Sequence, residues 1–409
     1  MARRDELVVG LDVGTTKVCA IVGQATEDGI DVMGIGSHPS KGLRKGVVVN
    51  IDVTVASIKK AVEEAEAMAG VEISTVYAGI AGSHIKSFQS TGVVAVRDGE
   101  VTAQDVQRVI DAARTIAIPS DSVVLHTLPQ EFIVDNQDGI KEPVGMSGVR
   151  LEAKVHIVTG GSTSMANITK CCERVGLHVA DVVLQPLASA EAVLSDDERE
   201  IGVALVDIGG GTTDIVLYAD GSVVHTSVLT LGGASVTMDV SQGLRTPLAE
   251  AEAVKQKYGC ALTALVDESE TVEVPMVGGR PPRSIPRRVL GEIIEPRMEE
   301  IFGLVAKVIE ESGQKEHLAA GVVLTGGGVT MRGTQELAEE VLGMPVRIGM
   351  PCGLGGLADV VRSPMYATAV GLLKFGARRT ASGEGAAVRE EPRWNGVRRR
   401  MGHWLKEVF

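Results

Sequence analysis

Aromatic residues are scarce in this sequence of 409 residues: phenylalanine, tyrosine and tryptophan together make up only 3% of it. Hydrophobic residues still reach 44% and charged residues 23%, proportions that are ordinary for a globular protein. The core must therefore be built from valine, isoleucine, leucine and alanine. A chain of this length has room for about two to four domains or subdomains.

Paired cysteines and long apolar runs are also missing. The five cysteines are an odd number without paired spacing, which is typical of reduced thiols packed in the core of a cytosolic protein. No apolar run reaches the roughly 18 residues of a membrane-spanning helix. The first apolar run is broken by Asp12, unlike that of a signal peptide. These absences predict a soluble, cytoplasmic body.

Positive charge is in the minority. Forty lysines and arginines face 53 aspartates and glutamates, which gives a formal net charge of −13. This balance argues against a dedicated nucleic-acid-binding protein, so we expect no nucleic-acid partner.

Two glycine turns in the sequence share one order of residues. Residues 9–18 read VGLDVGTTKV and residues 205–215 read LVDIGGGTTDI. In each, an apolar run leads to an aspartate, then glycine, then two threonines. Glycine lets backbone N–H groups approach an anion, and hydroxyl groups add further donors. Two copies indicate an internal duplication in which both turns bind one phosphate ligand.

The aspartate of each turn points to a metal ion. Asp12 and Asp207 would be repelled by a phosphate unless a cation lay between them, and Mg²⁺ usually keeps most of its waters and touches few protein groups. The simpler interpretation is a pair of β-hairpins with glycine turns. The repeated aspartate has no role in a hairpin, which favours the phosphate site.

A third glycine turn follows later in the chain. Residues 322–328 read VVLTGGG, again a buried strand leading into bare backbone. Because no side chain covers such a surface, a flat ligand such as a nucleoside could lie on it.

Helical periodicity predicts three further landmarks. A helix over 52–69 would be capped by Asp52 and ended by Gly70, and a helix over 246–258 would carry Pro247 at its first position. A long helix covers 288–312.

Three other stretches differ from these helices in their sequence pattern. Residues 84–160 combine short strands with a helix that starts at Thr102, so we expect an inserted α+β subdomain. Residues 263–286 look strand-like and end in an exposed basic loop. Residues 376–392 lose all periodicity, as a flexible linker does.

The last segment, residues 393–409, reads RWNGVRRRMGHWLKEVF and contains both tryptophans of the chain. At helical spacing one apolar stripe holds Trp394, Val397, Met401, Trp404, Leu405, Val408 and Phe409. The opposite face is basic. Such a helix usually packs on its own domain. A linker before it and the pairing of tryptophan with arginine favour a helix lying in the plane of an anionic membrane.

The motifs together resemble the superfamily of actin, chaperone ATPases and sugar kinases. Within it, the stretches GLRKGVVVN (42–50), PVGMSGVRLEAKVHIVTG (143–160), IEPR (294–297), HLAAGVVLTGGG (317–328) and YATAVGLL (366–373) are similar to the FtsA family of bacterial cell-division proteins. The resemblance covers nearly the whole chain.

This resemblance implies an α/β fold of two actin-like lobes with ATP and Mg²⁺ between them. It implies the following division of the chain: 1–83 with 161–195 (subdomain 1A), 84–160 (inserted subdomain 1C), 196–246 with 320–375 (subdomain 2A), 247–319 (subdomain 2B), the linker 376–392 and the membrane helix 393–409.

The resemblance also implies roles for single residues. Phosphate and nucleoside contacts fall on Gly14, Thr15, Thr16, Lys17, Gly209, Gly210, Gly211, Thr212, Thr213, Glu252, Lys255, Gly326, Gly327 and Gly328, and Asp12 and Asp207 hold Mg²⁺ through water. By spacing alone, Glu252 and Lys255 are equally well explained as a surface ion pair.

Hydrolysis depends on Gln185 in this scheme, because the superfamily places its water-orienting residue just before a helix. The amide of Gln185 can orient a water but cannot accept its proton at neutral pH. The sequence therefore predicts tight ATP binding with weak hydrolysis, which leaves the status of the chain as an enzyme open.

The resemblance to the FtsA family also implies binding partners and a location in the cell. The chain would bind the C-terminal peptide of the tubulin-like protein FtsZ on subdomain 2B, with Arg297 and Glu300 as candidates, although these are most often a solvated intrahelical pair. It would self-associate into filaments, recruit later division proteins, and sit peripherally on the cytoplasmic face of the inner membrane at the septum.

Three other protein classes share the nucleotide-binding turns and are alternative interpretations. They are a sugar or polyol kinase, a pilus-assembly actin homologue and a rod-shape filament protein. Two features argue against a kinase. No further aspartate lies in a motif typical of a kinase's catalytic base, and a kinase does not need the tail 393–409. The insertion at 84–160 argues against the rod-shape protein.

Overall fold

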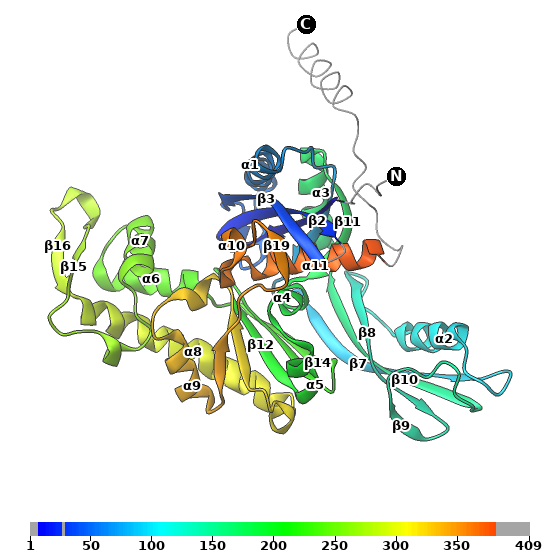
Figure 1. Ribbon diagram of the computed structural model, residues 1–409. Helices are drawn as coiled ribbons and strands as arrows, with labels where there is room; N and C mark the ends of the chain where they lie inside the picture. The colour runs from blue at the N-terminus through cyan, green and yellow to red at the C-terminus, as the bar shows by residue number, and fades with distance from the viewer. Residues whose placement is uncertain (1–6, 27–28, 382–409) are drawn as a thin grey trace, which may run out of the picture.

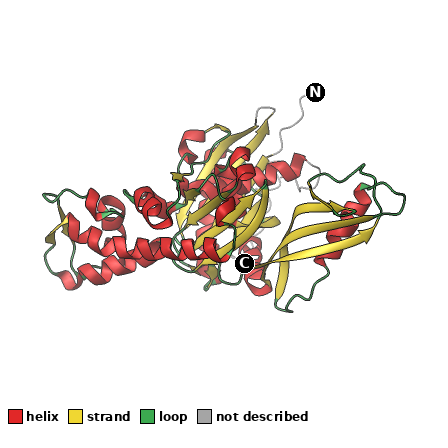
Figure 2. Ribbon diagram, turned by 90° about the horizontal axis from the view of Figure 1, so that it is seen from below, coloured by secondary structure: helices red, strands yellow, loops and turns green. Residues whose placement is uncertain are grey.

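The computed structural model describes residues 7–26 and 29–381 (Figure 1). Two α/β lobes stand next to each other, and a smaller α+β unit is attached to them. Seen from below, the molecule is elongated, with the helices around β15 and β16 at one end and a four-stranded sheet at the other (Figure 2).

The first lobe is built on a six-stranded sheet in the order β11-β6-β1-β2-β3-β19. Its strands are β1 (Leu7–Val13), β2 (Lys17–Thr26), β3 (Gly29–Pro39), β6 (Thr75–Ile80), β11 (His178–Leu184) and β19 (Leu354–Gly356). Strand β2 runs antiparallel to both β1 and β3, whereas β6 and β11 continue the sheet in parallel from β1.

The second lobe repeats this plan. Its sheet has the order β14-β13-β12-β17-β18, formed by β12 (Val203–Ile208), β13 (Thr213–Ala219), β14 (Ser222–Leu229), β17 (Val322–Thr325) and β18 (Val346–Ile348). Three antiparallel strands are again followed by two parallel ones. The predicted internal duplication is confirmed.

Helices cover both faces of the two sheets. The outer face of the first sheet is covered by α1 (Ile51–Ala69) and α3 (Ser162–Val175), and that of the second by α6 (Gly233–Leu244), α7 (Leu248–Tyr258), α8 (Arg287–Glu311) and α9 (Thr334–Leu342). Between the sheets lie α4 (Gln185–Val193) and α11 (Ala367–Ala381), in one apolar cluster with strands of both lobes (Figure 1). The clusters are dominated by aliphatic side chains, as the composition predicts. Among the described residues, the aromatic side chain of Phe302 is the largest that is fully buried.

The two central helices cross in direct backbone contact. A Cβ added at Gly371 of α11 would lie 1.7 Å from the carbonyl oxygen of Ala188 in α4. Only glycine permits this approach.

The attached α+β unit has its own sheet, in the order β7-β10-β8-β9. The strands are β7 (Lys86–Ala95), β8 (Ser122–Val134), β9 (Gln137–Ile140) and β10 (Arg150–Gly161), and α2 (Ala103–Arg114) packs against them. The predicted start of this helix is confirmed, because Thr102 and Asp105 form a reciprocal capping box. We call this unit, residues 86–161, the insert.

Smaller elements complete the chain. They are β4 (Leu43–Arg44), β5 (Val47–Val48), α5 (Asp196–Ile201), β15 (Thr271–Val274), β16 (Arg283–Pro286), α10 (Ala358–Val361) and the 3₁₀ turns η1 (Thr263–Leu265), η2 (Val277–Gly279), η3 (Lys315–His317), η4 (Gly327–Thr330) and η5 (Pro364–Tyr366).

Four details differ from the sequence-based expectation. Asn50, not Asp52, caps α1, because its side chain accepts the N–H of Val53. Pro247 lies at the N-cap of α7, one position before the first turn. Within 263–286 only β15 and β16 are strands. Helix α11 continues to Ala381, so 376–381 is not a linker, because Gly376 packs directly on Tyr77.

In the described ranges, no helix combines the length and apolarity needed to cross a bilayer. The tail 393–409 and residues 382–392 of the predicted linker lie outside the described residues.

Candidate functional site

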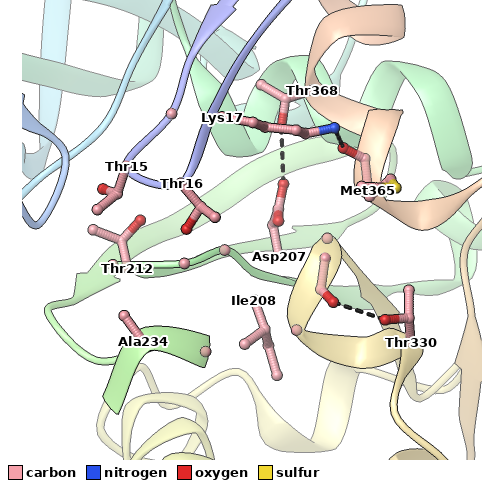
Figure 3. A pocket seen from close by; sticks show the side chains of 18 of the residues that line it. Thr15, Thr16, Lys17, Asp207, Ile208, Thr212, Ala234, Thr330, Met365 and Thr368 are labelled. Atoms are coloured by element: carbon pink, nitrogen blue, oxygen red, sulfur yellow. Dashed lines mark hydrogen bonds between the residues drawn. The ribbon is translucent and has the colours of Figure 1, made fainter. Parts of the chain in front are cut away.

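A cavity of about 500 Å³ opens between the two lobes. Its lining includes both duplicated turns, the third glycine turn and one face of α7, so segments far apart in the sequence converge on it (Figure 3). The predicted residues that line it are Asp12, Gly14, Thr15, Thr16, Lys17, Gln185, Asp207, Gly209, Gly210, Gly211, Thr212, Glu252, Lys255, Gly326, Gly327 and Gly328.

The two duplicated turns have the same backbone geometry. The N–H of Gly14 donates to the carbonyl of Lys17 at 3.0 Å, and that of Gly209 donates to Thr212 at 2.9 Å. The turns lie against each other at the cavity wall (Figure 3): a Cβ added at Gly210 would lie 1.8 Å from the hydroxyl of Thr16. The hydroxyl of Thr16 in the first turn therefore occupies the space that Gly210 of the second turn leaves by having no side chain.

Helix α6 begins behind the second turn. The N–H of Ala234 donates to the carbonyl of Gly210 at 2.8 Å, and Gly233 and Ala234 both line the cavity. The first turn of a helix carries backbone N–H groups and partial positive charge, which favours an anion at this wall.

Lys17 lines the cavity but is engaged elsewhere. Its Nζ donates to the carbonyl of Met365 at 2.5 Å and lies 3.9 Å from the centre of the Tyr366 ring. A contact between Lys17 and phosphate stays a prediction.

Three buried carboxyl groups line the cavity. Burial raises the pKa of Asp12 to about 7, although nearby Lys17 opposes the shift. Burial also raises the pKa of Asp207, which accepts hydrogen bonds from Ser189 at 2.6 Å and Thr368 at 3.1 Å. Burial, with Asp207 nearby, raises the pKa of Asp214 to about 8.

These carboxyl groups fit a hydrated cation. Oδ1 of Asp214 is buried without a hydrogen-bond partner, and oxygen donors are the ligands that Mg²⁺ prefers. Among the described residues, no group of three or more histidine, cysteine, aspartate or glutamate side chains is arranged to hold a metal directly. A cation here would therefore be held largely through water and ligand oxygens.

Gln185 lies next to the first carboxyl group. It is the first residue of α4, and its amide Nε2 donates to Oδ1 of Asp12 at 3.0 Å. The side chain thus projects into the cavity at the point where both duplicated turns converge.

The far end of the cavity is lined by α7 and the third turn. Nζ of Lys255 contacts Glu252 at 2.8 Å, the hydroxyl of Thr237 at 2.8 Å and the carbonyl of Gly233 at 3.0 Å. This network holds α7 against α6. Thr330 donates to Gly327 at 3.0 Å and closes the third turn (Figure 3).

Thr213 is not brought to the cavity. It is fully buried, and its hydroxyl donates to the carbonyl of Leu231 at 3.0 Å. Sequence reasoning missed Asp214, Ser189, Met365, Thr368 and Thr330. A signal existed for Asp214, because it pairs directly with Asp207 across the predicted hairpin.

Arg297 and Glu300 lie on α8, outside the cavity lining. They form the expected ion pair along the helix. Arg297 also contacts Asp239 of α6, at 2.6 Å and 3.2 Å from its two oxygens, so it joins two helices.

Comparison with known proteins settles the family. A model described as "Cell division protein FtsA" matches residues 204–371, and one described as "SHS2 domain inserted in FTSA" matches residues 82–159. The cell division protein FtsA of Pseudomonas aeruginosa is 51% identical over 411 residues, which cover 99% of this chain and 98% of that protein. The chain belongs to the FtsA family. FtsA of Neisseria meningitidis (46%, covering 100% of both chains) and of Bacillus subtilis (41%, covering 91% and 84%) are also similar.

Solved structures share the fold of this FtsA-family chain. A chain of the PilM-PilN type IV pilus biogenesis complex gives a TM-score of 0.65 at 17% identity, covering 90% of this chain and 98% of that one. MreB5 of Spiroplasma citri bound to ADP gives 0.58 at 14% identity, covering 93% and 98%. The predicted actin-like fold is confirmed, and the chain is a cell-division protein of the actin-like class.

Proposed function

We propose that the chain binds ATP with Mg²⁺ in the cavity and acts as a peripheral membrane tether for FtsZ filaments. The observation that carries the nucleotide part is the convergence of both duplicated turns and the third glycine turn on one cavity. The fold neighbour MreB5, whose structure holds ADP, supports this assignment.

The phosphates would lie against the duplicated turns, where glycine backbone leaves room for an anion and the positive end of α6 favours one. The nucleoside would lie against Gly326–Gly328 and the face of α7 that carries Glu252 and Lys255. Mg²⁺ would supply positive charge between the phosphates and the carboxylates of Asp12 and Asp207, with Asp214 as a further acceptor for its water shell.

Hydrolysis would be slow. The amide of Gln185, held by Asp12, can orient a water molecule at the phosphate end of the cavity. It cannot take up the proton of that water, and positioning alone leaves most of the acceleration to charge and backbone. ATP would therefore remain bound for long periods.

The tethering role rests on family membership and on the sequence of the tail. The FtsZ C-terminal peptide would bind the 247–319 region, where Arg297 and Glu300 are candidate contacts. The basic, tryptophan-containing segment 393–409 would bind anionic lipid on the cytoplasmic face of the inner membrane at the septum. Filament formation and recruitment of later division proteins belong to the same proposal.

Two measurements test it. Titration with a fluorescent ATP analogue, with and without Mg²⁺, should show saturable binding that weakens when Mg²⁺ is removed. Sedimentation should carry FtsZ down with anionic vesicles only when this chain is also present. Absence of nucleotide binding would reject the first part, and FtsZ pelleting equally without the chain would reject the second.

A further inference from the structure

A histidine of the insert contacts the segment that carries Gln185. His126 lies on β8, and its Nε2 accepts the backbone N–H of Leu184 at 3.0 Å. Leu184 is the last residue of β11 and directly precedes α4. The insert therefore reaches to within one residue of the nucleotide cavity.

His126 supplies a hydrogen-bond acceptor for the N–H of Leu184, which the first sheet does not provide. Strand β11 is the edge of the first sheet, so N–H groups on its outer side have no strand partner. Leu184 is fully buried, and a buried N–H without an acceptor is strongly unfavourable. No side chain caps the start of α4 either, so His126 holds the backbone at this junction.

Two other contacts hold the side chain of Gln185 in place. Its amide donates to Asp12, and a Cβ added at Gly79 of β6 would lie 3.0 Å from its Cγ. The side chain thus packs on bare strand backbone. Any shift of the β11–α4 junction would move the amide relative to Asp12.

We propose that His126 is a positioning residue for Gln185, so that the insert takes part in setting the rate of ATP hydrolysis. This rests on the proposed nucleotide function and deepens it. A partner that displaces the insert from β11 would change ATP turnover without touching the nucleotide.

The surroundings of His126 keep its acceptor nitrogen available. Burial lowers the pKa of His126 to about 4, with Arg379 adding to the shift and Asp181 opposing it. Arg379 and Asp181 pair with each other, which ties the end of α11 to β11 beside the imidazole. The ring is therefore neutral at pH 7.

The test compares single-turnover hydrolysis and ATP affinity in five full-length variants, one of which is the single variant Gln185→Ala. His126→Leu fills the site without an acceptor, and His126→Gln restores one. The double variant His126→Leu/Gln185→Ala asks whether the two residues act together. His156→Leu is the matched control, because His156 bonds Thr226 of β14 at 3.0 Å, on the side of the insert that faces the second lobe.

We expect His126→Leu to slow hydrolysis about tenfold or more, as misplacement of an orienting group does, while ATP affinity stays within about twofold. His126→Gln should recover most of the rate. The double variant should be no slower than Gln185→Ala alone, and His156→Leu should resemble the wild type. Exchange of the Leu184 amide should quicken only in the two variants that carry His126→Leu.

Several results would overturn the proposal: an unchanged rate in His126→Leu, equal losses in the Leu and Gln variants, or additive losses in the double variant. A wild-type chain that binds ATP but never cleaves it would also overturn it, while nucleotide binding would stand. A chain that binds no ATP would instead reject the proposed function itself.

Discussion

Gly210 marks the point where the turns of the two lobes meet. A valine there would place its Cβ 1.8 Å from the Thr16 hydroxyl, so the turns must separate and the phosphate donors would no longer converge. We expect Gly210→Val to weaken ATP binding by at least about tenfold, or 1.4 kcal/mol. Nucleotide titration measures the loss, and circular dichroism checks that the fold survives.

Gly303 provides the control for this substitution. It lies in α8, where an added Cβ meets nothing within 4 Å. Gly303→Val should leave ATP affinity unchanged. Equal affinity in Gly210→Val and the wild type would remove the second turn from the site.

At this scale the sequence predicts residues that lie in a repeated motif. Asp12 and Asp207 could be found because the two turns can be aligned by eye. Ser189 and Thr368, which donate to Asp207, come from α4 and α11 and belong to no motif. Only the fold brings them together, and the same holds for Met365, the acceptor for Lys17.

Among the elements, the insert is docked through neutral histidines. Burial lowers the pKa of His156 to about 4, with nearby His225 adding to the shift. The unfolded chain takes up a proton near pH 6.5 and the folded chain does not, so stability falls as pH drops from about 6.5 to 4. The slope approaches about 1.4 kcal/mol per pH unit for each such group.

Thermal unfolding at pH 7 and pH 5 should show this loss. The pH dependence of Tm should be smaller in His156→Leu than in the wild type. Replacement of His178, which is exposed on β11, should leave it unchanged. An undiminished pH dependence in His156→Leu would show that other groups govern acid stability.

A second prediction at this scale concerns the contact between helices α6 and α8. Arg297 joins them through Asp239, so Arg297→Glu would gather three acidic groups at one place. Partly exposed ion pairs contribute at most about 1 kcal/mol, so the fold should survive. If the FtsZ peptide binds here, its affinity should fall by about tenfold or more, as measured by fluorescence anisotropy.

Asp239→Asn separates the two roles of Arg297. It weakens the contact between the helices but keeps the guanidinium for a partner. We expect near-normal FtsZ affinity in this variant. Equal losses in Asp239→Asn and Arg297→Glu would indicate that helix packing, and not a contact at Arg297, determines binding.

Element boundaries were harder to predict than element types. Asn50 and Asp52 are both good capping residues, and only the observed bond to Val53 decides between them. The sequence predicts a linker from Gly376 because residues 376–392 lose periodicity, and glycine itself disfavours helices. Tertiary packing on Tyr77 overrides that preference and carries α11 to Ala381.

At the scale of the whole molecule, we expect the tail 393–409 to hold the chain on the membrane. Trp404→Glu would place a charge at the predicted lipid-facing stripe. We expect this variant to leave anionic vesicles in a flotation assay while its ATP affinity stays unchanged. Added salt should weaken binding of the wild type, because the basic residues of the tail would attract anionic lipid.

A chain that ends at residue 392 gives the complementary result. It should remain free of vesicles at every salt concentration and still bind ATP. If it floats as the full chain does, another surface holds the membrane and the tail has been given the wrong role.

The crossing of α4 and α11 restricts how the lobes can move. The chain passes from the first lobe to the second through α4, and α11 follows its return to the first sheet at β19. At Gly371 the two helices are in backbone contact. Such helices cannot slide past each other, but they can tilt about the contact. We therefore expect any opening of the cavity to be a rotation about this contact, and we expect a Gly371→Ala variant, whose Cβ would meet the Ala188 carbonyl, to hinder it.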